Sequence, residues 1–136
     1  MAKTQCKHVR TALFDPTSSP RVFGFTIKLR SDRGVVERYR AAHAAVWPEV
    51  IVAVRKAGVR NMRTFMHGLR LFMAIEGDEG FDLDRYRSVL AQDPACQRWQ
   101  ALMDEFQEPV PGAPTGEWWA RMELVFDLDW HRADGS

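Results

Sequence analysis

Residues 21–30 read RVFGFTIKLR, and this stretch decides which kind of fold the rest of the chain joins. Every second residue in it is large and apolar, namely Phe23, Phe25, Ile27 and Leu29. A period of two places alternate side chains on one face, so the stretch predicts a β-strand with that face on a core. We therefore expect a sheet-based fold, whose class depends on the elements that follow.

The next pattern is helical and covers residues 35–54. Apolar residues recur there at steps of three and four, which predicts an amphipathic helix of about six turns that ends near Gly58. Ser31 and Asp32 carry side-chain oxygens suited to capping its first turn. Pro48 lacks an amide hydrogen and crowds the preceding turn, so we expect a kink or a break just before it.

The remaining elements are strands and helices in a regular order. We expect two strands joined by a turn, two helical stretches and a last strand, over residues 59–66, 69–76, 82–90, 94–106 and 121–128. His67-Gly68 supplies the turn. Asp93 is placed to cap the second helical stretch, with Pro94 in the first-turn position where no amide hydrogen is needed.

The predicted order is strand, helix, strand, strand, helix, strand. This order is typical of the ferredoxin-like α+β fold (βαββαβ), in which helices cover one face of an antiparallel sheet. A second copy of the chain can cover the other face, so we expect a homodimer that forms a dimeric α/β barrel. We assign residues 21–130 to this domain, residues 1–20 to a flexible N-terminal tail and residues 131–136 to a C-terminal tail.

Composition excludes several classes of protein. The chain has 19 Lys and Arg residues and 18 Asp and Glu residues, which gives a net charge of +1. This balance argues against nucleic acid as a partner. No apolar run approaches the roughly 20 residues that span a membrane, and no secretory signal is evident. The cysteines Cys6 and Cys96 are too few for a disulfide framework, and the histidines lack metal-ligand spacing. We expect a cytoplasmic protein without a metal or a cofactor.

Three residues of the long helical stretch are candidates for chemistry. Tyr39 and His43 are four residues apart, so their side chains lie on one helix face, and Trp47 continues that stripe. An imidazole can donate and accept protons near neutral pH, so the three rings are candidates for lining a catalytic cavity. The spacing alone favours the plainer interpretation, a partly buried histidine among core aromatics.

A second group of aromatic residues lies in the C-terminal half. Trp99, with Tyr86 upstream, offers a flat indole of the kind that stacks on a sugar ring, or else a core aromatic. Trp118 and Trp119 are interpreted as a pocket wall, a dimer contact or a cover over the sheet end. Cys96 is interpreted as a small apolar group. Four arginines are interpreted as a solvated face from which one or two can reach a pocket: Arg55, Arg60, Arg63 and Arg70.

Several of these segments together resemble the L-rhamnose mutarotase family. The segments are Tyr39-Arg-Ala-Ala-His43, Val46-Trp-Pro-Glu49, Gly58 with Asn61, Asp93-Pro-Ala-Cys-Gln-Arg-Trp99 and Glu123-Leu-Val-Phe126. The resemblance runs from about Arg21 to Leu128. It implies a dimeric, cofactor-free enzyme that interconverts the α and β pyranose anomers of a 6-deoxy sugar. L-Rhamnose is the expected sugar, and L-fucose is the alternative.

The resemblance also implies roles for individual residues. His43 stands at the position of the acid/base group, Tyr39 lies beside it, and Trp99 walls the sugar site. The family has a second tryptophan where this chain has Gln100, and a tryptophan is common at the position of Tyr86. We therefore expect two catalytic residues, His43 and Tyr39, and five that bind a monosaccharide: Trp99, Tyr86, Trp47, Asn61 and Gln100.

Two other functions fit the same architecture. The first is a dimeric ferredoxin-like monooxygenase, from which the Tyr-x-x-x-His and Cys-Gln-Arg-Trp stretches point away. The second is a module that binds a sugar or another small ligand without catalysis, in which His43 only forms a hydrogen bond.

Overall fold

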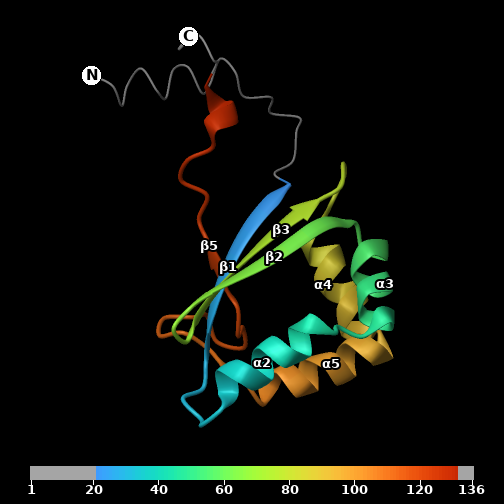
Figure 1. Ribbon diagram of the computed structural model, residues 1–136. Coiled ribbons are helices and arrows are strands. Elements are labelled where there is room, and N and C mark those ends of the chain that lie inside the picture. Colours follow the sequence, from blue (N-terminus) through green and yellow to red (C-terminus); the bar gives the residue numbers. More distant parts are fainter. Residues whose placement is uncertain (1–20, 132–136) are drawn as a thin grey trace, which may run out of the picture. The chain divides into compact units, whose positions relative to one another are not determined.

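A computed structural model describes residues 21–131 of the chain (Figure 1). Chain contacts divide the protein into two units, of which residues 21–122 form one. The described part of the other unit is residues 123–131. The predicted N-terminal tail, and the C-terminal tail apart from His131, lie outside the described residues.

An antiparallel sheet forms the frame of the unit of residues 21–122. Its strands are β1 (Val22–Leu29), β2 (Val59–His67), β3 (Arg70–Gly77), β4 (Gln107–Glu108) and β5 (Ala120–Met122). The order across the sheet is β2-β3-β1-β4, and β5 also pairs with β1. The hairpin predicted around His67-Gly68 is confirmed, because β2 and β3 pair from Val59↔Gly77 to His67↔Arg70.

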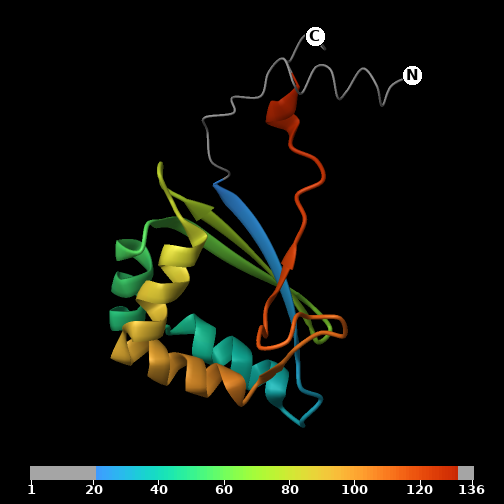
Figure 2. The same cartoon turned by 180° about the vertical axis from the view of Figure 1, so that it is seen from behind.

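Four helices cover one face of this sheet (Figures 1 and 2). They are α2 (Val35–Ala44), α3 (Pro48–Lys56), α4 (Leu83–Gln92) and α5 (Pro94–Asp104). The alternating residues of β1 point toward them, since Phe23, Phe25, Ile27 and Leu29 are all buried. The α+β class and the inward face of β1 are therefore as predicted. No helix within residues 21–131 is long and apolar enough to cross a membrane.

The break predicted before Pro48 is confirmed and is complete. α2 ends at Ala44, Trp47 has φ −59° and ψ 133°, and Pro48 begins α3. The predicted cap of the first helix is wrong. α2 starts after Gly34, which has φ 77°, and no side chain caps it. Gly34 permits this left-handed turn, which places the helix start too far along the chain for Ser31 or Asp32 to act as cap.

The predicted last strand over residues 121–128 forms only at its start, as β5, and its extension beyond Met122 is wrong. The edge of β1 is shared by two short strands, with Lys28 and Leu29 pairing β4 and residues 24–26 pairing β5. β5 ends at Met122, residues 123–127 belong to no helix or strand, and Leu128–Trp130 form a 3₁₀ turn. Alternation shows which residues can form a strand, whereas strand formation also needs an unpaired neighbouring edge.

No helix of residues 21–122 lies on the second face of the sheet (Figures 1 and 2). This face carries apolar side chains. Phe65 and Phe72 are cross-strand partners whose rings stack with centroids 6.0 Å apart. A Cβ atom at Gly24 would lie 3.0 Å from the Phe72 ring, so the glycine lets this ring lie against β1. We call this surface the open face. Its most exposed apolar side chains are Val22 (46%), Phe65 (56%), Phe72 (38%) and Met122 (45%).

Candidate functional site

A cavity of ≈ 900 Å³ lies within the unit of residues 21–122. Side chains of β1, β2 and β3 contribute to its lining, including Phe25, Met62 and Met73. All four helices contribute as well, and so does the loop before β5. Most of the lining is apolar, so a ligand inside it contacts mainly apolar surface.

Six of the seven residues predicted for the site line this one cavity. They are Tyr39, His43, Asn61, Tyr86, Trp99 and Gln100. Trp47 does not line it, because it lies in the break between α2 and α3 and packs edge-on against Trp99, with ring centroids 5.2 Å apart. Trp47 therefore supports the wall of the cavity and is not part of it.

Tyr39 and His43 form the polar centre of the cavity. Their four-residue spacing on α2 brings the rings to a centroid distance of 4.2 Å, with planes 30° apart. His43 Nδ1 lies 3.1 Å from the carbonyl oxygen of Tyr39. A carbonyl only accepts hydrogen bonds, so Nδ1 carries the hydrogen, and Nε2 holds the lone pair of the neutral ring.

The two side chains have opposite proton preferences. Partial burial lowers the pKa of His43 below its usual 6.5, and the hydrogen bond to the Tyr39 carbonyl opposes this change. Burial raises the pKa of Tyr39 to about 12, and the side chain of Gln107 opposes this change. At neutral pH the imidazole is therefore a base and the phenol a proton donor.

Trp99 is held at the cavity by the local structure of α5. Asp93 caps this helix, accepting a hydrogen bond from the Cys96 amide at 3.0 Å, and Pro94 is its first residue, as predicted. The Trp99 ring then meets His43 edge-on, with centroids 5.4 Å apart and planes at 72°. An indole braced on two sides in this way presents a rigid wall to a ligand.

Tyr86 and Cys96 are kept in their protonated forms by burial. Burial, helped by the nearby Cys96, raises the pKa of Tyr86 to about 12, with Arg87 opposing it. Burial, helped by the adjacent Asp93, raises the pKa of the Cys96 thiol to about 11. Both groups stay protonated at neutral pH, and the buried thiol fits the interpretation of Cys96 as a small apolar residue.

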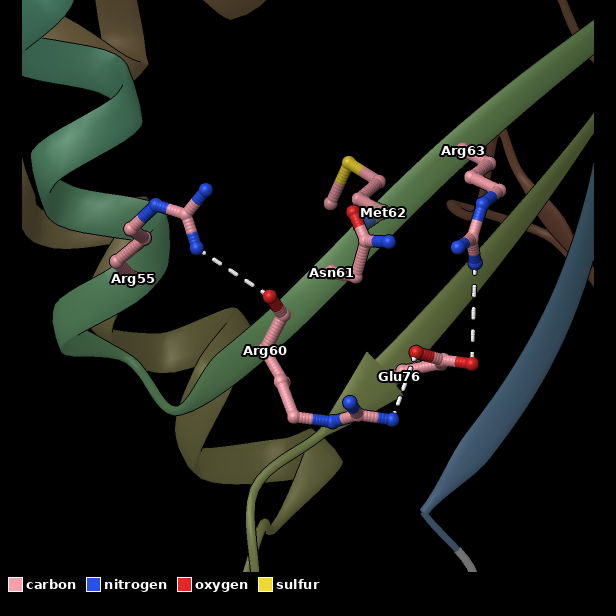
Figure 3. A network of polar contacts seen from close by, with 6 residues as sticks. All are labelled: Arg55, Arg60, Asn61, Met62, Arg63 and Glu76. Carbon is pink, nitrogen blue, oxygen red and sulfur yellow. Dashed lines mark hydrogen bonds and ion pairs between the residues drawn. The ribbon is translucent and has the colours of Figure 1, made fainter.

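A polar network lies where β2 begins (Figure 3). The Arg55 guanidinium donates to the carbonyl of Arg60 at 3.2 Å, and Arg60 forms an ion pair with Glu76 at 2.9 Å. Arg63 approaches the other oxygen of Glu76 at 3.8 Å. Among the arginines interpreted as a solvated face, Arg55 lines the cavity, whereas Arg60 and Arg63 are exposed partners of Glu76.

Two amide side chains of the predicted site are already held by neighbours. Asn61 Oδ1 accepts from the Met62 amide at 2.9 Å, which leaves its Nδ2 hydrogens as donors (Figure 3). Gln100 Nε2 donates to Asp104 Oδ1 at 2.8 Å, which leaves its oxygen as an acceptor. Both residues retain hydrogen-bonding capacity of the kind that selects among sugar hydroxyls.

Two further residues line the cavity, and the sequence analysis either missed them or left their role open. Gln107 is only 2% exposed, and its Oε1 has no hydrogen-bond partner among the described residues. No sequence signal marks it, because β4 has only two residues. Trp119 lines the cavity. Trp118 does not, and the central carbon of the Arg30 guanidinium lies 6.0 Å from the centroid of its ring. Of the roles considered for this pair, a place in the pocket wall is therefore confirmed for Trp119 only.

The described residues also set limits on metal binding. Within residues 21–131, no group of three or more His, Cys, Asp or Glu side chains is arranged to hold a metal ion. The polar side chains that line this cavity are the imidazole of His43, the phenols of Tyr39 and Tyr86, the amides of Asn61, Gln97, Gln100 and Gln107, the hydroxyl of Thr64, the thiol of Cys96, the carboxylate of Asp104, the indoles of Trp99 and Trp119, and the guanidinium groups of Arg55 and Arg87.

Comparison with known proteins identifies relatives over most of the chain. A family model described as L-rhamnose mutarotase matches residues 22–128. A UPF0734 protein of Dictyostelium discoideum is 35% identical over 111 residues, which cover 78% of this chain and 88% of that protein. An L-fucose mutarotase of Xanthomonas campestris pv. campestris is 33% identical over 106 residues, covering 76% and 85%.

More distant matches agree with this result. An L-rhamnose mutarotase of Sinorhizobium fredii is 29% identical over 87 residues, covering 62% of this chain and 79% of that protein. The crystal structure of an L-rhamnose mutarotase from Formosa agariphila superposes with a TM-score of 0.59 at 21% identity, covering 79% of this chain and 98% of the other. This structural match shows a shared fold.

Proposed function

The chain belongs to the L-rhamnose mutarotase family, and on that premise we propose that it interconverts the α and β pyranose anomers of a 6-deoxy-L-sugar. The observation that carries the proposal is the pairing of a basic His43 with a protonated Tyr39 at a largely apolar cavity. Mutarotation needs one group that removes a proton and one that delivers it, and these two residues supply both.

The reaction opens and closes the sugar ring. The anomeric hydroxyl loses its proton, the bond between C1 and the ring oxygen breaks, and the ring oxygen gains a proton. The product is the open aldehyde, which rotates about the C1–C2 bond. The reverse steps then close the ring on the other face, so no net proton, electron or leaving group is exchanged with the enzyme.

Each residue of the pair has a distinct task in this proposal. His43 Nε2 takes the proton from the anomeric hydroxyl, and the Tyr39 hydroxyl donates to the ring oxygen. The roles reverse as the ring closes, and positioned acid–base groups of this kind accelerate reactions by roughly 10²–10⁴-fold. Trp99 and Tyr86 hold the faces of the sugar, and Asn61 and Gln100 bind its hydroxyls.

L-Rhamnose is the sugar we propose, with L-fucose as the second candidate. The second candidate is favoured by the relative named as an L-fucose mutarotase, which is 33% identical. The two sugars have the same 6-methyl group and differ in the orientation of ring hydroxyls. Apolar side chains such as Val50 and Met62 suit the methyl group, so the hydrogen-bonding residues are the ones that select between the two.

We propose that the active form is a homodimer, in the manner of a dimeric ferredoxin-like α/β barrel. Its support is the open face, on which Phe65 and Phe72 stack without a covering element of residues 21–122. Burying this face against its counterpart removes apolar surface from water, and a two-fold axis makes the face complementary to itself.

The deciding experiment is NMR exchange between the anomeric signals of each sugar, with and without protein. Saturation transfer between the α and β signals should appear with the wild type and disappear in His43→Ala. His67→Ala is the matched control, because His67 is an exposed residue of β2 that does not line the cavity, and it should behave as wild type. Sugar-dependent stabilisation without faster exchange would instead indicate a binding module, and the proposal would be wrong.

A further inference from the structure

Arg87 reaches from α4 to the sheet side of the cavity. Its side chain lines the cavity, although much of the residue is exposed. The central carbon of its guanidinium lies 5.7 Å from the centroid of the Phe25 ring. Phe25 belongs to β1, is only 3% exposed and lines the same cavity. The charged end of Arg87 therefore lies at the cavity, over a buried ring.

This ring holds the guanidinium in place. A cation is attracted to the electron-rich face of an aromatic ring, and the attraction is stronger where water is partly excluded. Phe25 is fixed by its packing in the core, where it lies in one cluster with Phe23, Val59 and Ile75. The guanidinium of Arg87 is thus positioned before a ligand enters, which lowers the entropy lost on binding.

The N–H groups of Arg87 are free of partners within the protein. Among residues 21–131, no hydrogen bond or ion pair engages its guanidinium. Asp104 is the one carboxylate of the described residues that lines the cavity, and it accepts from Gln100. Arg55 also lines the cavity but donates to the Arg60 carbonyl. A guanidinium carries five N–H donors and no acceptor, so Arg87 offers donors to a ligand.

Arg87 and the proposed catalytic pair contact different parts of the cavity. Tyr39 lies in one core cluster with Ile27, which is two residues along β1 from Phe25. Two residues of a strand span about 7 Å, and α2 and α4 lie over different parts of the sheet (Figures 1 and 2). A pyranose whose C1 and ring oxygen lie at His43 and Tyr39 has C3 and C4 on its opposite side. Arg87 is therefore placed for the hydroxyls of C3 and C4.

We propose that Arg87 is a substrate-binding residue whose guanidinium donates to the neighbouring sugar hydroxyls at C3 and C4. The inference rests on the proposed function, because that function places C1 and the ring oxygen at the catalytic pair. The planar guanidinium has parallel N–H groups, which two neighbouring oxygens can accept together. The C4 hydroxyl is equatorial in L-rhamnose and axial in L-fucose, so Arg87 contacts a hydroxyl whose orientation differs between the two sugars.

Arg87→Met tests this role, because methionine removes the donors and keeps an unbranched side chain that can still cover Phe25. We expect KM for the preferred sugar to rise by about tenfold and kcat to change by less than about threefold, since the lost bonds exist both before and during the reaction. Arg85→Met is the control, because Arg85 is exposed on α4 and does not line the cavity. It should behave as wild type, and an unchanged KM in Arg87→Met would overturn the inference.

A sugar analogue locates the contact. The 4-deoxy analogue of the preferred sugar lacks the oxygen at C4, so KM of the wild type for it should be higher by about tenfold. Arg87→Met should lose most of this preference, because its partner at C4 is already gone. If Arg87→Met prefers the sugar over the analogue as strongly as the wild type does, another residue binds the C4 hydroxyl and the inference fails.

A binding measurement separates this inference from the proposed catalysis. L-Rhamnose and L-fucose are titrated into the wild type, Arg87→Met and Arg85→Met, with binding followed by calorimetry. If the wild type binds a sugar without faster anomer exchange, the proposed function is wrong, and Arg87 is still supported if Arg87→Met alone binds about tenfold more weakly. Equal affinity of the two variants, or no binding of either sugar to the wild type, would refute the role of Arg87.

Discussion

The Nδ1 atom of His43 lies 3.1 Å from the carbonyl oxygen of Tyr39, one helical turn earlier on α2. The same two residues bring their rings to a centroid distance of 4.2 Å. The backbone of Tyr39 thereby sets the tautomer of the imidazole, while its side chain lies beside the ring as a second proton-transfer group. One helix turn thus supplies both halves of a general acid–base pair.

The pH dependence of the rate should show a single acidic limb. The pKa of His43 is lowered, so its basic form is already dominant at neutral pH and is lost as the pH falls through that lowered value. The pKa of Tyr39 is about 12, so its proton is kept well above neutral pH. We expect kcat/KM to be flat from about pH 7 to about pH 9 and to fall only at a pH lower than the usual imidazole pKa of 6.5.

The measurement is saturation transfer across this range, corrected for the uncatalysed exchange at each pH. His67→Ala should reproduce the wild-type profile, because His67 does not line the cavity. A rate that rises as the pH falls would show that protonated His43 is the active form, contrary to the assignment of the imidazole as the base.

Trp99 and Trp47 should differ in their effect on sugar binding, although their rings are in contact. Trp99 lines the cavity and Trp47 does not, so Trp99→Ala should raise KM by about tenfold or more and lower kcat less. Trp47→Ala should act mainly through loosened packing, with a smaller rise in KM. Steady-state anomer exchange and thermal unfolding of both variants check this, and equal KM values would contradict it.

Trp119 and Trp118 offer a second matched pair. Both are half-buried against the core residues of β1, so each substitution by alanine should lower the free energy of unfolding by about 1–3 kcal/mol. Only Trp119 lines the cavity, so only Trp119→Ala should weaken sugar binding. Ligand titration followed by intrinsic fluorescence or calorimetry would measure this, and weaker binding in Trp118→Ala would show that the loop acts as a unit.

A charge on the open face should disrupt the proposed homodimer. Phe65 is 56% exposed, so Phe65→Glu should leave the subunit folded and shift the protein toward monomer, because a glutamate buried in the interface lacks a partner. Val52→Glu is the control, since Val52 is 52% exposed on α3, away from that face. Sedimentation velocity at several concentrations measures the result, and a monomeric wild type would refute the proposal.

Much of the local structure follows from patterns that act over a few residues. The alternation in residues 22–29 predicts the buried face of β1, and Pro48 predicts the end of α2 because its ring is incompatible with the preceding turn. Asp93 predicts the start of α5 through its hydrogen bond to the helix amide. The shared face of Tyr39 and His43 likewise follows from helix geometry, which needs no information from the rest of the chain.

Tertiary structure alone decided the parts of the site that depend on pairing between distant segments. Residues 107–108 and residues 120–122 both pair with the same edge of β1. The alternation of residues 121–128 does not predict that two segments share this edge. The pairing of Gln107 with Leu29 buries an amide at the cavity that Tyr39 also lines, and Trp119 reaches the same cavity from the loop before β5. These contacts join segments tens of residues apart, so only the folded chain brings their side chains together.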